Sequence, residues 1–149
     1  MTDRDKEYFF GEEMQELIPQ RPPMQMVDTF CGIRDGISRS GLTVTPENVF
    51  CIGGRLVEPG IVEHMAQSAA ARIGYLCRRE GREVPLGYIA SIDRMAFYFL
   101  PETGQTLDTS MEVLQEVFGI TLAGIVTRIG NEVVAEGVMK IFLETGTET

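Results

Sequence analysis

Residues 59–81 constrain the fold of this chain more than any other stretch. Pro59 suits the first turn of a helix, and Arg78, Arg79 and Gly81 are typical of a helix end. Between these ends, apolar or small residues cover most of the helix circumference, so the predicted helix is buried on nearly all sides. Its alanine-rich middle allows another group to pack close to the helix backbone.

The residues after this helix predict antiparallel strands. The alternation is clearest in residues 106–118, where Leu107, Thr109 and Met111 fall on one face. Gly130-Asn131 is typical of a tight hairpin turn. We therefore expect strands at residues 88–99, 106–118, 119–129 and 132–143, and a frayed tail at residues 144–149.

The residues before the long helix predict a short helix and a hairpin. Apolar residues at helical spacing indicate a helix over residues 11–18, and the prolines that follow it end the helix. We expect strands at residues 24–30 and 37–44, with turn residues at Gly32 and Asp35-Gly36, and then a loop at residues 46–58. The complete pattern is α+β: one antiparallel sheet wrapped around one long central helix. We expect a single domain over residues 1–149, with its core at about residues 11–143.

Charge and composition exclude several classes of protein. The chain has 13 basic and 22 acidic residues, and its net charge of −9 repels nucleic acid phosphates. No apolar run approaches the ~20 residues that cross a bilayer, and residues 1–7 are too charged for a signal peptide. Cys31, Cys51 and Cys77 lack metal-ligand spacing and are expected to stay reduced. We therefore expect a cytoplasmic protein without a metal ion or other cofactor.

Three motifs, in the same order along the chain, resemble those of a known family. They are LIPQRPPM at residues 17–24 followed by Val27-Asp28, Pro59-Gly60 followed by EHMAQ at residues 63–67, and SIDRMAF at residues 91–97 followed by GQTL at residues 104–107. These motifs resemble those of the hot-dog-fold beta-hydroxyacyl-[acyl-carrier-protein] dehydratases. The resemblance covers about residues 17–143 and implies the hot-dog fold, in which active sites form between the subunits of a dimer.

The chain also departs from the pattern of that family. The family has a catalytic histidine in a His-Phe-Pro loop before the central helix, whereas residues 49–54 here contain no histidine. Gln20 stands where the opening motif has histidine, and Pro59-Gly60 lies closer to Glu63 than is usual. A branch similar to the dehydratases of aryl-polyene-type clusters also lacks the loop, and this chain looks closest to that branch.

The start of the long helix contains the candidate catalytic residues Glu63, His64 and Gln67. Glu63 can transfer a proton, and Gln67 lies at i+4, where it can hold the carboxylate. His64 is the only histidine and the natural general base near neutral pH. Glu63 and His64 are consecutive, however, and diverge by about 100° on a helix. Catalysis by His64 therefore remains open beside a structural role in the core.

The remaining candidate site residues would bind the acyl thioester and its carrier. Free N–H groups near Gly60 at the helix start suit a thioester carbonyl, and the basic residues near the helix end suit an acidic carrier protein or a CoA phosphate. The substrate candidates are Gly53, Gly54, Gly60, Ala66, Ala70, Phe97 and Phe99, and the carrier-docking candidates are Arg72, Arg78, Arg79 and Arg82.

Three functions fit these residues. The main prediction is dehydration of 3-hydroxyacyl chains on acyl carrier protein, in fatty-acid-like or polyene lipid synthesis, by a homodimer. The first alternative is a hot-dog thioesterase in which Glu63 activates water. The second is a non-catalytic subunit that binds acyl thioesters or a partner enzyme. The fold alone does not distinguish them.

Overall fold

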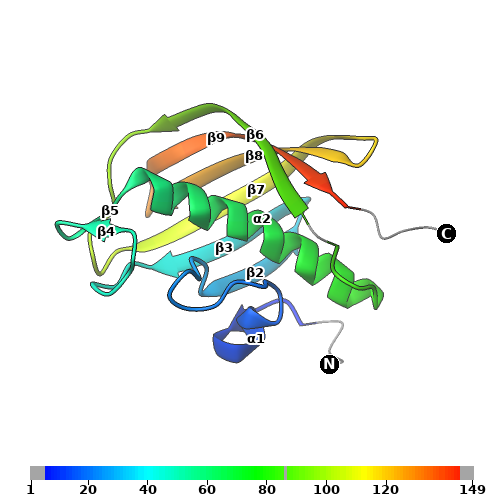
Figure 1. Cartoon of the computed structure of the whole chain (residues 1–149), viewed down its shortest axis with the longest axis horizontal. Helices are drawn as coiled ribbons and strands as arrows, with labels where there is room; N and C mark the ends of the chain where they lie inside the picture. The colour runs from blue at the N-terminus through cyan, green and yellow to red at the C-terminus, as the bar shows by residue number, and fades with distance from the viewer. Residues whose placement is uncertain (1–5, 86, 145–149) are drawn as a thin grey trace.

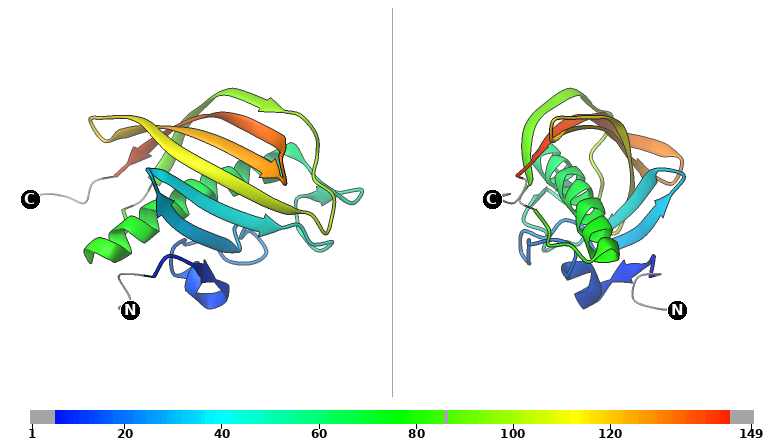
Figure 2. Two further views of the ribbon diagram at one scale, coloured as in Figure 1. Left: turned by 180° about the vertical axis from the view of Figure 1, so that it is seen from behind. Right: turned by 90° about the vertical axis from the view of Figure 1, so that its right-hand side faces the viewer.

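The computed structural model describes residues 6–85 and 87–144. Within these residues, one antiparallel sheet of seven strands curls around a single long helix, α2 (Glu58–Glu80). Figure 1 shows α2 lying along the concave face, and the end-on view in Figure 2 shows the sheet closing around it. The predicted α+β hot-dog architecture is confirmed.

The sheet order places sequence-distant strands side by side. Across the sheet the strands are β1 (Phe9–Phe10), β2 (Thr29–Arg34), β3 (Ile37–Thr43), β7 (Thr106–Val117), β8 (Ile120–Ile129), β9 (Glu132–Leu143) and β6 (Gly87–Phe97). A separate hairpin, β4 (Cys51–Ile52) with β5 (Arg55–Leu56), lies just before α2, and the short helix α1 (Gly11–Gln15) follows β1. Strand β6 is therefore an edge strand, although it precedes β7 in sequence.

Local sequence chemistry explains where α2 begins and ends. Pro59 lies in its first turn, where a missing N–H costs no helical hydrogen bond. Gly81 caps its carboxyl end in the left-handed region with φ of 67°, and its N–H donates to the Arg78 carbonyl. Between these ends, twelve of the residues of α2 are buried. This burial agrees with the prediction that apolar or small residues cover most of the helix circumference.

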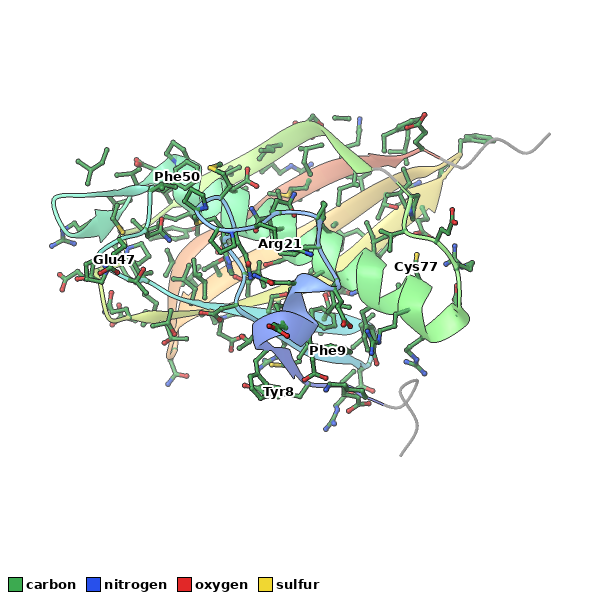
Figure 3. The ribbon with its side chains drawn as sticks, turned by 60° about the horizontal axis from the view of Figure 1, so that its bottom comes forward. Tyr8, Phe9, Arg21, Glu47, Phe50 and Cys77 are labelled. Carbon is green, nitrogen blue, oxygen red and sulfur yellow. The ribbon has the colours of Figure 1, made fainter. Side chains whose placement is uncertain are left out.

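The apolar side chains form two clusters on different sides of α2. The main cluster fills the space between α2 and the central strands and includes Met65, Leu107 and Met139. The second cluster, which we call the N-terminal cluster, consists of Phe9, Met14, Leu17, Ile18, Val27, Phe30, Ala71 and Tyr75. It ties β1 and α1 to the second half of α2. Figure 3 shows Phe9 in this region, beside α1.

Two segments before α2 differ from the sequence-based expectations. The helix at residues 11–18 is shorter than expected and ends at Gln15, although Leu17 and Ile18 are still buried. Residues 24–28 precede β2, which begins only at Thr29. The backbone of Met26 instead bonds to side chains of α2, which removes it from a strand ladder.

The loop expected at residues 46–58 contains the β4–β5 hairpin. Its turn is Gly53-Gly54, with φ of 60° and 77°, which glycine adopts without strain. The strands after α2 lie within two residues of the expected bounds. The tail prediction falls mostly on residues 145–149, outside the described residues.

In the part of the chain that the structure describes, no helix has the length and apolar character that a bilayer crossing requires.

Candidate active site

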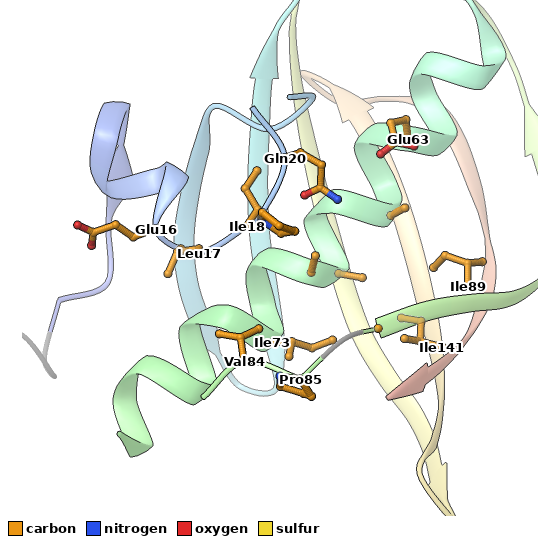
Figure 4. Close-up of a pocket in the computed structure, with 15 residues that line it drawn as sticks. Glu16, Leu17, Ile18, Gln20, Glu63, Ile73, Val84, Pro85, Ile89 and Ile141 are labelled. Atoms are coloured by element: carbon orange, nitrogen blue, oxygen red, sulfur yellow. The ribbon is translucent and has the colours of Figure 1, made fainter. Parts of the chain in front are cut away.

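A cavity of about 520 Å³ lies along one side of α2. Leu17 and Ile18 from the N-terminal cluster form one wall, and Ala69 and Ile141 from the main cluster contribute to the other. The cavity therefore lies at the seam between the two clusters. Figure 4 shows Glu63 at one end of it and Val84 and Pro85 at the other.

Three of the predicted site residues line this cavity. Glu63 contributes a half-buried carboxylate, and Ala66 and Ala70 follow it along the same helix face. Because alanine side chains are short, the space beside the α2 backbone stays open for a ligand. The remaining lining is largely apolar and suits a hydrocarbon chain.

Gln67 holds the Glu63 carboxylate without lining the cavity itself. Its Nε2 donates to Glu63 Oε2 at 2.8 Å and to the Met24 carbonyl at 2.8 Å. Its Oε1 accepts from the Met26 N–H at 2.6 Å. The buried carboxamide thus connects Glu63 to the backbone of the segment before β2. The i+4 spacing predicts that Gln67 can hold Glu63, and the Nε2–Oε2 distance of 2.8 Å agrees with that prediction.

His64 lies outside the cavity, fully buried between α2 and the sheet. Its Nδ1 is 2.7 Å from the Met26 carbonyl and its Nε2 is 2.7 Å from the Thr109 hydroxyl. Burial lowers the pKa of His64 to about 4, although the hydrogen bond to Met26 acts in the opposite direction. Of the two roles that the sequence leaves open for His64, this placement favours the structural one, since both nitrogens already have partners within the protein.

The glycine and phenylalanine candidates also lie outside the cavity. The Gly60 N–H donates to the Val57 carbonyl at 2.9 Å, so it is not the free N–H group expected for a thioester carbonyl. A Cβ at Gly60 would lie 2.5 Å from Phe50 Cβ, which explains the glycine by packing alone. Gly53 and Gly54 form the exposed β4–β5 turn, and neither Phe97 nor Phe99 lines the described cavity.

The four arginines have different environments. Arg72 is buried and donates to the Gly36 and Met111 carbonyls, which removes it from a docking surface. Arg78 pairs with Glu16 and lies over the Phe9 ring.

Arg79 and Arg82 remain exposed at the end of α2. Arg79 lies over the Tyr75 ring and Arg82 pairs with Glu80. Val84 and Pro85, which follow Arg82 in the chain, line the end of the cavity away from Glu63.

Gln20 also lines the cavity, although it was not predicted as a site residue and was noted only for replacing a histidine. Its Oε1 is shielded from solvent and accepts no hydrogen bond from the described residues. The signal was its position in the LIPQRPPM motif. The apolar lining from Ile73 and Ile89 had no such signal, because apolar residues in a helix or strand look alike whether they face a core or a cavity.

Comparison with known proteins identifies the family. A family model described as the ApeP dehydratase, of the ApeP-like type, matches residues 12–148. The chain belongs to the ApeP-like dehydratase family. The predictions of a hot-dog dehydratase and of its aryl-polyene-type branch are confirmed.

Individual proteins similar to this ApeP-like chain agree with the family match. It is 30% identical to a 3-hydroxyacyl-[acyl-carrier-protein] dehydratase FabZ from Ruminiclostridium cellulolyticum, over 87% of this chain and 94% of the relative. It is 34% identical to the FabZ of Herpetosiphon aurantiacus, over 85% and 92% of the two chains. The fold matches a chain of the dehydratase heterocomplex ApeI:P from Xenorhabdus doucetiae, with a TM-score of 0.80, 18% identity and coverage of 91% and 93%.

Proposed function

We propose that this chain dehydrates 3-hydroxyacyl thioesters carried on acyl carrier protein, with Glu63 as the catalytic residue. The observation that carries the proposal is the Glu63 carboxylate, held by Gln67 and opening into an otherwise largely apolar cavity. Such a cavity suits an acyl chain, and the carboxylate is placed at one end of it. The FabZ relatives support the substrate class.

One carboxylate can carry the proton through the whole elimination. Glu63 takes the C2 proton, the C2–H electron pair forms the C2=C3 double bond, and the C3–O bond breaks. The proton then passes from Glu63 to the departing hydroxide, which leaves as water and restores the carboxylate. Among the residues that line the described cavity, the only other titratable side chain is Glu16, which pairs with Arg78. Glu63 is therefore assigned both proton transfers.

The carrier protein is proposed to dock at the end of α2. Arg79 and Arg82 are exposed there, and their guanidinium groups can bond to carboxylates or phosphates of an acidic partner, which would compete with Glu80 for Arg82. The adjacent cavity end at Val84 and Pro85 gives a route from this site toward Glu63. Arg72, which is buried, is not part of the proposed surface.

A dimer is proposed to form through β6. This strand is at one edge of the sheet and exposes apolar side chains, including Ile89 and Ile92. Ile89 also lines the cavity, so a second chain paired with β6 would lie beside the substrate. The partner is a second copy of this chain or a different dehydratase chain, since the similar Xenorhabdus chain belongs to a dehydratase heterocomplex. Light scattering of the chain alone distinguishes the two. A cytoplasmic location remains a prediction from the sequence.

Mass spectrometry of a 3-hydroxyacyl thioester tests the reaction. With the substrate linked to carrier protein, the wild-type chain is expected to produce a species lighter by one water. Glu63→Gln is expected to lower kcat by about 10²–10⁴-fold, because the amide cannot carry the proton. Glu58→Gln, at the exposed start of α2, is the matched control with unchanged kcat.

The alternative outcomes contradict the proposal in distinct ways. Release of free carrier thiol would identify a thioesterase. Intact substrate with wild-type chain, either alone or with a partner dehydratase chain present, would indicate a binding or partner role. Full turnover by Glu63→Gln would remove Glu63 from the mechanism.

A further inference from the structure

A buried row of hydrogen bonds runs from the sheet into α2 and on to the backbone before β2. The Thr127 hydroxyl on β8 is 2.7 Å from the Thr109 hydroxyl on β7. Thr109 Oγ1 is 2.7 Å from His64 Nε2, and His64 Nδ1 is 2.7 Å from the Met26 carbonyl. All four residues are almost entirely buried, so no water competes for these groups.

The row continues from Met26 to the catalytic carboxylate. The two polar backbone groups of Met26 are both bonded to side chains of α2: His64 takes the carbonyl and Gln67 takes the N–H. Gln67 is the same residue that donates to Glu63 Oε2. Met26 is therefore held between His64 and Gln67. Together with the Met24 carbonyl, which accepts from Gln67 Nε2, it fixes the carboxamide that holds Glu63.

The chemistry of the groups determines where the proton lies on His64. A backbone carbonyl only accepts, so Nδ1 carries the proton and donates to Met26. Nε2 is then unprotonated and accepts from the Thr109 hydroxyl, which in turn accepts from Thr127. In this arrangement every hydrogen bond of the row joins one donor to one acceptor. A protonated Nε2 would leave Nδ1 facing the carbonyl without a hydrogen between them.

We propose that His64 is a positioning residue for Glu63, acting through Met26 and Gln67. Its imidazole fixes the Met26 carbonyl while Thr109 fixes the ring, so the sheet, α2 and the segment before β2 together determine the direction of the Glu63 carboxylate. The catalytic consequence rests on the proposed function, whereas the hydrogen-bond arrangement does not. Low exposure of His64 agrees with this role, because a positioning residue has no need to reach substrate.

The imidazole can be tested directly by NMR, without any substrate. The sequence contains one histidine, so a ¹⁵N-labelled chain gives a single imidazole spin system. We expect a protonated Nδ1, an unprotonated Nε2 and no titration between pH 8 and pH 5. A proton on Nε2, or titration near pH 6.5, would overturn the proposal.

Two substitutions separate the two contacts of the imidazole. In His64→Asn the amide nitrogen occupies about the place of Nδ1 and keeps the contact with Met26. In His64→Gln the longer amide occupies about the place of Nε2 and keeps only the contact with Thr109. Each variant loses one hydrogen bond of the row, so their melting temperatures should fall by similar amounts.

Turnover is expected to distinguish these variants. His64→Gln should lower kcat by about 10–100-fold with KM within about twofold, because a misplaced carboxylate slows the chemistry rather than binding. His64→Asn should recover most of kcat. Thr109→Val should lower kcat less than His64→Gln. Thr106→Val is the matched control with unchanged kcat, since it breaks a similar hydroxyl pair, with Thr43, at an exposed place on the same strand.

Equal loss of kcat in the two His64 variants, or a change confined to KM, would show that His64 does not position Glu63. If the wild-type chain has no dehydratase activity, the proposed function fails. The positioning role is then tested by measuring hydrogen exchange of the Gln67 side-chain amide. Its hydrogen exchange should be faster in His64→Gln than in His64→Asn. Equal exchange in both variants would overturn the positioning role independently of any activity.

Discussion

Glu63 and His64 are adjacent in the chain and have opposite surroundings. Glu63 faces a cavity, where its carboxylate can meet a ligand and still accept from Gln67. His64 is enclosed by the sheet, with both ring nitrogens bonded within the protein. The divergence of about 100° between consecutive helical side chains separates the two roles.

The burial of His64 makes stability depend on pH. The folded chain keeps the imidazole neutral down to a pKa of about 4, whereas an unfolded histidine takes up a proton below about pH 6.5. The unfolded state therefore binds more protons between these values. The contribution of His64 to stability is fully present above pH 6.5 and is lost as the pH falls from 6.5 toward 4.

Urea unfolding at a series of pH values measures this effect. Between pH 6.5 and pH 5, where most carboxylates stay ionised, we expect the free energy of unfolding to fall with a slope approaching about 1.4 kcal/mol per pH unit. His64→Asn is expected to remove most of that slope, although it is less stable at every pH. The same slope in wild type and His64→Asn would show that the group responsible is not His64.

For these residues, contacts within α2 were predictable from the sequence, whereas contacts with other elements were not. The i+4 spacing indicated that Gln67 could hold Glu63, because helix geometry alone brings the two together. No local signal showed that His64 is directed toward the sheet. Its partners Met26 and Thr109 are 38 and 45 residues away, and their approach depends on the tertiary fold.

At the scale of elements, α2 approaches the N-terminal segment closely at Gly74. A Cβ at Gly74 would lie 2.1 Å from the Leu17 carbonyl oxygen, a distance that requires the backbone to move. Glycine usually weakens a helix interior, so its presence here is explained by this contact. Leu17 also lines the cavity, which links the packing of α2 to the shape of the site.

Substitution of this glycine tests the contact. Gly74→Ala is expected to lower the free energy of unfolding by about 1–3 kcal/mol, despite the higher helix propensity of alanine, because overpacking displaces Leu17. Denaturant unfolding measures the change. Gly124→Ala is the control, since its Cβ would meet only ordinary contacts with Leu114. A Gly74→Ala chain as stable as wild type would show that residues 16–18 can shift without cost.

The element bounds were predictable wherever the local pattern and the tertiary partners agreed. In β7, β8 and β9 the alternation of apolar residues matches a sheet with one face toward α2, and the bounds agree closely with the prediction. Residues 24–28 have a similar composition. Met24 and Met26, however, bond through their backbones to side chains of α2 rather than to a neighbouring strand, and periodicity contains no information about that.

At the scale of the whole molecule, the exposed arginines beyond the cavity end can select the form of the substrate. We compare KM for the carrier-linked substrate with KM for the pantetheine-linked substrate. In the double variant Arg79→Glu with Arg82→Glu, the ratio of the first KM to the second is expected to rise about tenfold. The reason is that only the carrier presents an acidic surface to these side chains. Steady-state kinetics at low salt measures the ratio. Arg39→Glu together with Arg55→Glu, two exposed arginines on β3 and β5, is the matched double charge reversal. An equal ratio in all variants would place carrier docking elsewhere.

The seam position of the cavity has a consequence for local stability. A ligand that fills it touches Leu17 and Ile18 on one side and Ala69 and Ile141 on the other, and so bridges two separately packed clusters. Its binding free energy then stabilises the packing of residues 9–18 against α2, because the ligand binds only while those residues are in place. The reverse also holds: detachment of residues 9–18 would remove Leu17 and Ile18 from the cavity wall, while the pairing of β2 with β3 and of the strands beyond it needs no contact with those residues. We therefore expect ligand binding in this cavity and local unfolding of residues 9–18 to be coupled equilibria.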